Sequence, residues 1–463
     1  MQLSLSSAAA SGIGRARFGV LAMIFVVTVL NYADRATVGV AGPVLSKELG
    51  IDAVQMGFIF SAFSWSYVLG QLPGGWLLDK FGAKQVYAWS ILLWSLFTML
   101  QGSVHHMGMD QMLFGLPLAV SALFLMRLMV GLSESPSFPA NGRMVAAWFP
   151  VKERGTASAI FNSAQYFATV LFAPIMAWIV HAIGWSEVFY FMGGLGILMS
   201  VLWMRTMHNS PAEHPSISAA EREYIEAGGA LLSGSNKASQ ASQASQASQA
   251  ARVAGPRLGY LKQLLANRML MGVYLAQYCV NVLTYFFLTW FPIYLVKERG
   301  MSLLNAGFVA ALPAICGFAG GVLGGVISDW LLRRGHSLTF ARKLPIVVGM
   351  LLSTSMIACN YVGIEAVVVG IMALAFFGKG LGALGWAVVS DTSPKEIAGL
   401  SGALFNTFGN VAGIVTPIVI GYIVQTTHSF NGALVFVGAH ALVAVLSYLL
   451  IVGEIKRVEL KPV

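Results

Sequence analysis

The chain has 463 residues, of which 57% are hydrophobic and only 10% are charged. Soluble domains carry roughly 25% charged residues, so this chain has too few charges to cover the water-facing surface of a soluble protein of its length. Together with a mean hydropathy of +0.73, this composition excludes a soluble class and predicts a polytopic membrane protein.

Apolar segments of about 20 residues, the length that a helix needs to cross the hydrocarbon core, recur along the whole chain. They are continuously apolar and do not alternate with a period of two, which excludes an outer-membrane barrel. The pattern therefore predicts an all-α fold in which the first span is retained and not cleaved. Twelve membrane helices are predicted, near residues 18–41, 54–77, 85–104, 112–138, 156–181, 186–206, 267–296, 303–332, 343–362, 365–389, 397–424 and 430–452.

Most of the Lys and Arg residues outside these spans lie on one side of the predicted membrane. Positively charged short loops stay in the cytoplasm, so both termini are predicted to be cytoplasmic. This topology also accounts for the formal net charge of +9 and gives no reason to expect nucleic acid as a partner. The three cysteines are expected to be free core residues, and no metal site is predicted.

A polar stretch at 207–262 separates six spans from six. Within it, 238–249 consists of four Ala-Ser-Gln triplets, a composition that cannot bury a core. Two patterns occur on both sides: SAIFN at 158–162 resembles GALFN at 402–406, and GxxxD at 75–79 returns at 325–329. We therefore predict two pseudo-symmetric halves, 1–206 and 263–463, joined by a partly disordered cytoplasmic linker, with substrate bound between the halves.

The longer motifs resemble a known family. GWLLDKFGAK at 75–84 resembles the loop 2–3 signature of the major facilitator superfamily, and NYADR at 31–35 is similar to its anion:cation symporters. ESPSFPAN at 134–141, AAWFP at 146–150 and GTASAIFNSAQY at 155–166 resemble bacterial glucarate/galactarate proton symporters. The resemblance covers nearly the whole chain. It implies a monomeric transporter of the bacterial inner membrane, with no enzymatic activity, that takes up a hexarate dianion with protons by alternating access and needs no other cofactor.

Five charged residues lie in the interior of predicted spans, away from their ends, where a charge at a helix centre costs roughly 2.5–3.5 kcal/mol on insertion scales. They are Asp34, Arg35, Arg127, Glu134 and Lys379. One interpretation is structural: two salt bridges hold helices together, and Lys379 is left unpaired. The other assigns Asp34 and Glu134 to proton coupling, because a substrate that competes for a neighbouring arginine changes how readily a buried carboxyl is protonated. The resemblance implies the second role and implies that Arg127 positions the acid near it.

The resemblance and side-chain chemistry together select a set of substrate-binding residues. Arginine binds a carboxylate bidentately, and tyrosine and amide groups pair with hydroxyls. The candidates are Tyr32, Arg35, Tyr67, Gln165, Trp386 and Asn406, with Asn162 and Asn410 as further candidates about a turn away. Interfacial aromatics, interhelical amide hydrogen bonds and core packing are the alternative interpretations of these residues.

Lys379 is the only charge that the second half contributes in the interior of a predicted span, away from its ends. Our hypothesis is that Arg35 binds one carboxylate of a hexarate and Lys379 binds the other, so that the substrate bridges the halves. If Lys379 instead snorkels or pairs with a helix end, the substrate is a monocarboxylate such as galactonate or a hexuronate. A dianion that enters with one proton each on Asp34 and Glu134 moves without net charge, so at least two protons are predicted.

Two other groups of residues have roles away from the substrate. Asp79, Lys80, Lys84, Asp329 and Arg333 are predicted to form cytoplasmic gate contacts, Asp79 with Lys80 and Asp329 with Arg333, that break and re-form as the halves rock. The pattern GxGxxG at 380–385 matches a dinucleotide-binding motif, but no strand precedes it. Close helix packing is therefore predicted there.

Overall fold

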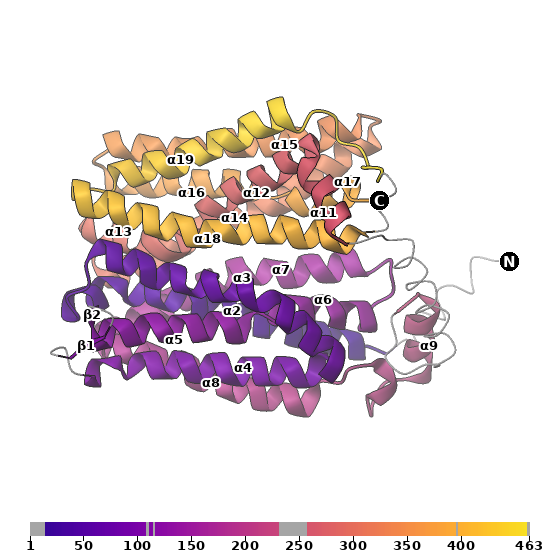
Figure 1. Ribbon diagram of the computed structural model, residues 1–463, viewed down its shortest axis with the longest axis horizontal. Helices are drawn as coiled ribbons and strands as arrows, with labels where there is room; N and C mark the ends of the chain where they lie inside the picture. The colour runs from indigo at the N-terminus through magenta and orange to yellow at the C-terminus, as the bar shows by residue number, and fades with distance from the viewer. Residues whose placement is uncertain (1–13, 108–110, 114–115, 231–256, 395–396, 461–463) are drawn as a thin grey trace.

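The computed structural model describes residues 14–107, 111–113, 116–230, 257–394 and 397–460. Two bundles of long helices lie side by side with their axes along the longest dimension, as Figure 1 shows. One end carries α9 (Ala219–Ala227), and the other carries the short strands β1 (Met112–Leu113) and β2 (Leu116–Pro117). We call these the α9 end and the β end. The Ala-Ser-Gln triplets at 238–249 lie outside the described residues.

The bundle formed by the earlier helices is here called the first half. Its helices end where backbone geometry or capping requires it: Asp52 and Gln55 form a reciprocal capping box before α3, and Gly82, at φ 81°, separates α3 from α4. The helices are α2 (Ala16–Glu48), α3 (Ala53–Phe81), α4 (Ala83–Gly102), α5 (Leu118–Glu134), α6 (Ser137–Trp148), α7 (Arg154–Ala182) and α8 (Trp185–Thr206).

The later helices form the second half, and several of them are broken within the span. Side chains of Asn267, Ser302 and Ser337 cap three of their N-termini. The elements are α12 (Arg268–Tyr285), a π-helical turn (Phe286–Trp290), α13 (Phe291–Lys297), α14 (Leu303–Arg333), α15 (Leu338–Ser353), a 3-10 stretch (Thr354–Tyr361), α16 (Glu365–Leu381), α17 (Gly385–Thr392), α18 (Ala398–Thr427), α19 (Asn431–Leu446) and a final π-helical turn (Ser447–Ile451).

Eleven helical stretches among the described residues are long and apolar enough to cross a membrane. The remaining predicted span, 85–104, corresponds to α4, which has the length of a span at 20 residues. Its Trp, Tyr, Ser and Gln residues lower its hydropathy, and it packs between α5 and α8. The predicted start of the fourth span was wrong: Met112–Leu113 and Leu116–Pro117 form the β1–β2 pair, the helix begins at Leu118, and after a break it continues to Trp148.

Part of the predicted linker is folded onto the first half at the α9 end. This part includes a 3-10 turn (Pro211–Glu213) and α9. The end of the linker forms α11 (Arg257–Ala266), which lies beside the second half. The buried carboxylate of Glu221 in α9 accepts hydrogen bonds from the backbone N–H groups of Ala16 and Arg17 at 3.0 and 3.1 Å, and the Arg17 guanidinium also pairs with it. Glu221 therefore satisfies free donors at the start of α2.

The two halves meet mainly toward the β end. There α2 packs on α13, α3 on α18, and α7 on α14. The fit is close because glycines face the neighbouring backbone: a Cβ on Gly57 of α3 would lie 2.5 Å from the Pro417 carbonyl oxygen of α18, and one on Gly307 of α14 would collide with Ala177 of α7. The β end is thus the closed end of the space between the halves.

Candidate functional site

A buried ion pair joins α2 to the end of α5 in the middle of the first half. The guanidinium of Arg35 pairs with Glu134 Oε1, and the exposed fractions of these residues are only 6% and 0%. Four aromatic rings lie around the guanidinium, with centroids 4.7–5.9 Å from its central carbon: Tyr32, Phe63, Tyr67 and Phe138. We call them the aromatic box. They replace water with cation–π contacts.

The two other charges of the first half lie near this pair without joining it. Asp34 accepts a hydrogen bond from the Thr98 hydroxyl of α4 at 2.8 Å. Arg127 lies 5.5 Å from the Phe63 ring, and its Nε has no hydrogen-bond partner among the described residues. Within the described chain neither Asp34 nor Arg127 has an ion pair within 4 Å, so only one of the two salt bridges that the structural interpretation required is present.

Lys379 lies near the end of α16 and is 4% exposed. It makes no hydrogen bond or ion pair with any residue in the described parts of the chain. Its ammonium nitrogen lies 5.3 Å from the Tyr166 ring of α7 and 4.9 Å from the Phe376 ring of its own helix. A buried cation without an anion is costly, and this one contacts both halves.

A small cavity of about 50 Å³ lies between the halves. Tyr32 of α2 and Gln165 of α7 line it from the first half, and Phe376, beside Lys379, lines it from the second. Tyr166 of α7 also lines the cavity from the first half. The cavity therefore connects the surroundings of Arg35 with those of Lys379. Ligand sites for drug-sized molecules occupy about 300–1,000 Å³, so the halves are not closed around a ligand-sized space.

The remaining candidates of the second half lie on two adjoining helices. Asn410 of α18 accepts a hydrogen bond from the Tyr285 hydroxyl at 3.1 Å and donates one to the Asn406 carbonyl oxygen at 2.9 Å. The Trp386 ring of α17 lies 4.9 Å from the ring of Phe405, and Trp386 is 52% exposed. In the first half, Asn162 is also exposed, one turn from Gln165.

The predicted gate residues make their contacts within one half each. Asp79 pairs with Arg143 of α6, while the Lys80 ammonium lies 4.9 Å from the Trp76 ring. Arg342 pairs with both Asp329, at 3.7 Å, and Asp391, at 2.8 Å.

The other two gate candidates make mainly backbone contacts. Arg333 donates a hydrogen bond to the backbone oxygen of Asp329, and the backbone of Lys84 binds Asn209 and Trp203. The pairings of Asp79 with Lys80 and of Asp329 with Arg333 are therefore not those of this structure. Their role as a gate stays a prediction.

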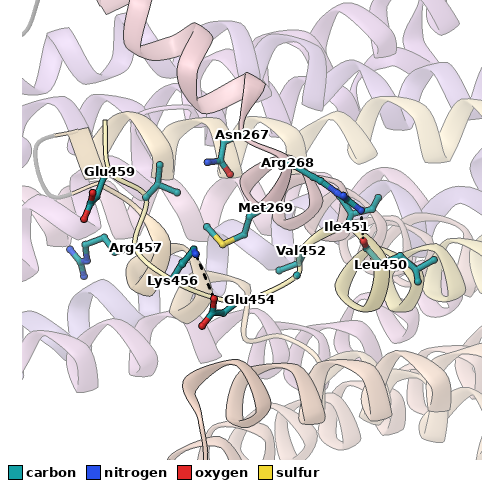
Figure 2. A pocket seen from close by; sticks show the side chains of 12 residues that line it. Asn267, Arg268, Met269, Leu450, Ile451, Val452, Glu454, Lys456, Arg457 and Glu459 are labelled. Atoms are coloured by element: carbon teal, nitrogen blue, oxygen red, sulfur yellow. Dashed lines mark hydrogen bonds and ion pairs between the residues drawn. The ribbon is translucent and has the colours of Figure 1, made fainter. Parts of the chain in front are cut away.

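A larger pocket, of about 800 Å³, lies at the α9 end between the start of α12 and the C-terminal segment. Figure 2 shows its lining side chains, among them Arg268, Lys456 and Glu454. Lys456 pairs with Glu454 at 3.5 Å, and Arg268 donates to the Leu450 carbonyl oxygen at 2.7 Å. This pocket contains none of the predicted site residues.

Several residues at the site were missed by the sequence analysis. Phe63 and Phe138 complete the aromatic box, Thr98 binds Asp34, and Tyr166 contacts Lys379. Apolar rings in an apolar span carry no signal of their own. Thr98 is a different case, because a polar residue within a span invites a search for a partner.

Glycine packing in the second half matches the expectation for the GxGxxG pattern. A Cβ on Gly380 would collide with the Gly317 carbonyl oxygen of α14, and a Cβ on Gly324 would collide with the Leu381 carbonyl oxygen. The helices α14 and α16 are therefore in backbone contact, which confirms close helix packing at this motif.

Comparison with known proteins places this architecture in a family. The profile of the Major Facilitator Superfamily matches residues 24–341. Among solved structures, a bacterial homologue of the human lysosomal transporter Spinster, in an inward-facing and occupied conformation, superposes with a TM-score of 0.70 at 16% identity, covering 95% of this chain and 97% of that one. A D-xylose-proton symporter gives a TM-score of 0.69 at 17% identity, covering 95% and 98%. These two likenesses show the fold.

Curated relatives are much more similar in sequence. The chain is 60% identical over 462 residues to a probable galactarate/D-glucarate transporter (GudP) of Escherichia coli strain K12, covering 99% of each. It is 61% identical to the protein of the same name in Bacillus subtilis strain 168, covering 96% of this chain and 94% of that one. A D-galactonate transporter of Escherichia coli O6:H1 is 39% identical, covering 96% and 97%. These relatives are named as transporters and not as enzymes. The chain belongs to the major facilitator superfamily and is a multi-pass membrane transporter.

Proposed function

We propose that the protein takes up a hexarate dianion, galactarate or D-glucarate, together with protons by alternating access. The names of the relatives at 60% and 61% identity support this substrate class. The distribution of Lys and Arg supports a bacterial inner membrane location with the α9 end in the cytoplasm. A monomer would be sufficient, because every residue assigned below comes from one chain.

The observation that carries the proposal is the presence of two cations on opposite sides of the cavity between the halves. Arg35 reaches it through the aromatic box, whose Tyr32 lines the cavity. Lys379 reaches it through Tyr166 and Phe376, and it is buried without an anion. A linear molecule with a carboxylate at each end would supply the missing partner of Lys379 and could compete with Glu134 for Arg35.

Hydroxyl recognition would come from neutral groups around these cations. Tyr32, Tyr67 and Gln165 belong to the first half, and Asn406 and Trp386 to the second, with Asn162 and Asn410 beside them. Their O–H and N–H groups suit a polyhydroxylated chain. Selection among stereoisomers would depend on these side chains, because both isomers present the same terminal carboxylates.

Proton coupling follows from the competition for Arg35. A substrate carboxylate that takes the guanidinium leaves Glu134 without its counter-ion, and a carboxylate buried without one favours the protonated form. In the same half, Asp34 provides a second acid and Arg127 provides a second cation. An inside-negative potential opposes each negative charge by about 2.3 kcal/mol per 100 mV, so two protons per dianion would remove this electrical cost.

Alternating access is supported by the asymmetry of contacts between the halves. They pack closely toward the β end, whereas the ion pairs of Asp79 and Asp329 at the α9 end stay within one half. Closing the α9 end while opening the β end would expose the site to the other side. Asp79, Lys80, Lys84, Asp329 and Arg333 would exchange their partners in that step.

Uptake by purified protein in proteoliposomes tests the proposal. With an acidic outside and no potential, labelled galactarate or D-glucarate should accumulate against its gradient, and a protonophore should abolish accumulation. A potential alone should drive little flux if two protons accompany each dianion. Outward flux driven by an inside-negative potential in proportion to the negative charge would contradict this stoichiometry.

A monocarboxylate substrate is the second candidate, supported by the D-galactonate transporter at 39% identity. In that case Lys379 would be structural. A thermal-shift panel with glucarate, galactarate, galactonate, glucuronate and glycerate distinguishes the two. Stabilisation by the two dianions alone would support the hexarate, whereas equal stabilisation by galactonate or glucuronate would support the monocarboxylate.

A further inference from the structure

A row of buried polar residues lies along α2 on a face different from the one that lines the cavity. Tyr32, Ala36 and Val40 line the cavity. Thr28, Asn31 and Arg35 follow one another at spacings of three and four residues, so they share a face. Since each residue turns an α-helix by about 100°, the centre of this face is turned by roughly 100° from the cavity-lining face, toward the interior of the first half, and Arg35 lies on its edge nearer the cavity. Asn31 is 1% exposed.

A matching row lies opposite, on α5 and α6. Glu134 is the last residue of α5 and Asn141 lies in α6, and both are fully buried. Two contacts connect the rows: Arg35 pairs with Glu134, and the Asn141 amide donates to the Thr28 hydroxyl at 3.0 Å. On α2, Asn31 lies between these two contacts. It therefore faces the space that they enclose.

Several polar atoms in this space make no hydrogen bond of good geometry with the described residues. They are both amide atoms of Asn31, Glu134 Oε2, Asn141 Oδ1 and the hydroxyl of Tyr87. Tyr87 comes from α4, is fully buried and lies beside Asn141, Thr28 and Glu134. Buried polar groups in proteins are almost always hydrogen-bonded, to ordered water where no protein group is available. A cluster from four helices with both donors and acceptors has the composition of an internal water site.

The opposite side of Glu134 offers no such path. There the aromatic box surrounds Arg35, and Glu134 itself is 0% exposed. The other charged groups around it are Asp34, Arg35 and Arg127, and the neighbouring phenols are Tyr32, Tyr67, Tyr87 and Tyr285. A carboxyl group that binds and releases a proton in every cycle must exchange it with water, and the unpartnered atoms lie on the Asn31 side.

We propose that ordered water held by Asn31, Tyr87 and Asn141 forms the path by which Glu134 exchanges its coupling proton with solvent at the α9 end. The path runs inside the first half, separate from the substrate cavity. Beyond Asn141, α6 reaches the surface at Gly142 and at Arg143, which pairs with Asp79. This inference rests on the proposed proton coupling.

The proton balance is simple. When the O–H bond at Glu134 Oε2 breaks, the proton forms an O–H bond on the adjacent water, and the carboxylate pairs again with Arg35. The Tyr87 hydroxyl accepts a proton from one water and gives its own to the next, so it is unchanged after each passage. Bulk water at the α9 end is the final acceptor.

Transport by two variants tests the path. Tyr87→Phe removes the hydroxyl and keeps the ring, and Asn31→Leu removes both amide atoms at similar volume. We expect uptake driven by a pH gradient to fall at least fivefold in each. Counterflow at equal pH exchanges substrate without net proton release, so it should stay within twofold of wild type. Tyr274→Phe is the matched control, because Tyr274 is a buried tyrosine of the second half that is hydrogen-bonded to Ser401 at 3.1 Å.

Wild-type uptake rates in both Tyr87→Phe and Asn31→Leu would overturn the path, as would an equal loss of uptake and counterflow in protein that still binds substrate. If Tyr87→Phe does not fold, Asn31→Leu alone decides. A structure at a resolution that shows ordered water gives a second measurement, independent of transport: water should bridge Glu134 Oε2 and Asn31. A dry cluster there would contradict the proposal. Failure of the proposed function would appear instead in the wild type, as uptake without proton dependence.

Discussion

The two halves use charge within the membrane in opposite ways. The first half buries four charged residues close together, and one ion pair, Arg35 with Glu134, lies at the centre of the group. Among its described residues, the second half buries Lys379 as its single charge, against aromatic rings and without an anion. The buried acids and arginines at the centre of the first half thus balance in charge without substrate, whereas the buried charge of Lys379 in the second half is not balanced. We infer that proton binding belongs to the first half and that the second half contributes a site which only a ligand can satisfy.

Replacing the acid of the first half should have the largest effect on accumulation. Glu134→Gln keeps the shape but can neither bind nor release a proton. Because the proposed second acid, Asp34, is intact in this variant, we expect accumulation on a pH gradient to fall sharply while counterflow continues, and the uptake rate to depend less on external pH. Proteoliposome uptake and counterflow, measured from pH 5 to 8, check this. Normal accumulation by the variant would exclude Glu134 from proton coupling.

Arg35→Gln should have the next largest effect. Truncating one member of a buried hydrogen-bonded charge pair costs about 2–5 kcal/mol, and the variant also loses the fork that binds a carboxylate. We expect uptake of galactarate to fall at least about 100-fold. Arg35→Lys is the control, since it keeps the charge and loses the fork, and it should fall between wild type and Arg35→Gln. Uptake within threefold of wild type in Arg35→Gln would show that the ion pair is not used by substrate.

Lys379→Gln tests the second half, in which the buried charge is not balanced. A hydrogen bond to a charged group contributes about 1.5–3 kcal/mol, so affinity for a hexarate should fall at least about tenfold. Affinity for galactonate should change little. Isothermal titration with both ligands, with Lys379→Arg as a charge-preserving control, measures the difference. Equal binding of galactarate by Lys379→Gln and wild type would leave Lys379 a structural residue and would favour the monocarboxylate.

Trp386→Phe should have the smallest effect. The replacement keeps a ring against Phe405 but loses the indole N–H. One neutral hydrogen bond contributes about 0.5–1.5 kcal/mol, so affinity should fall about twofold to tenfold. Because Trp386 is exposed in this state, the melting temperature of the unliganded protein should not change. A lower melting temperature would identify Trp386 as a packing residue.

The sequence predicted spans and family, because hydropathy and long motifs act over many residues. It did not predict the breaks within spans, such as the π-helical turn at Phe286–Trp290, since these depend on neighbouring helices. Spacing along one helix relates Glu134 only to residues of its own helix such as Arg127, but the partner of Glu134 is Arg35 from another helix. Contacts between helices, including Thr98 with Asp34, lie beyond what periodicity along a single helix can show.

Because α14 and α16 are in backbone contact, the two helices would move together as one rigid unit. At Gly307, α14 touches α7 of the first half, and at Gly324 it is in contact with the helix that carries Lys379. These points are 17 residues apart, about 25 Å along the helix. If the halves turn about the contact at Gly307, a rotation of about 10° would displace the far end by about 4 Å. A displacement of that size is enough to break an ion pair, so a small rotation would make or break the contact between Lys379 and its ligand.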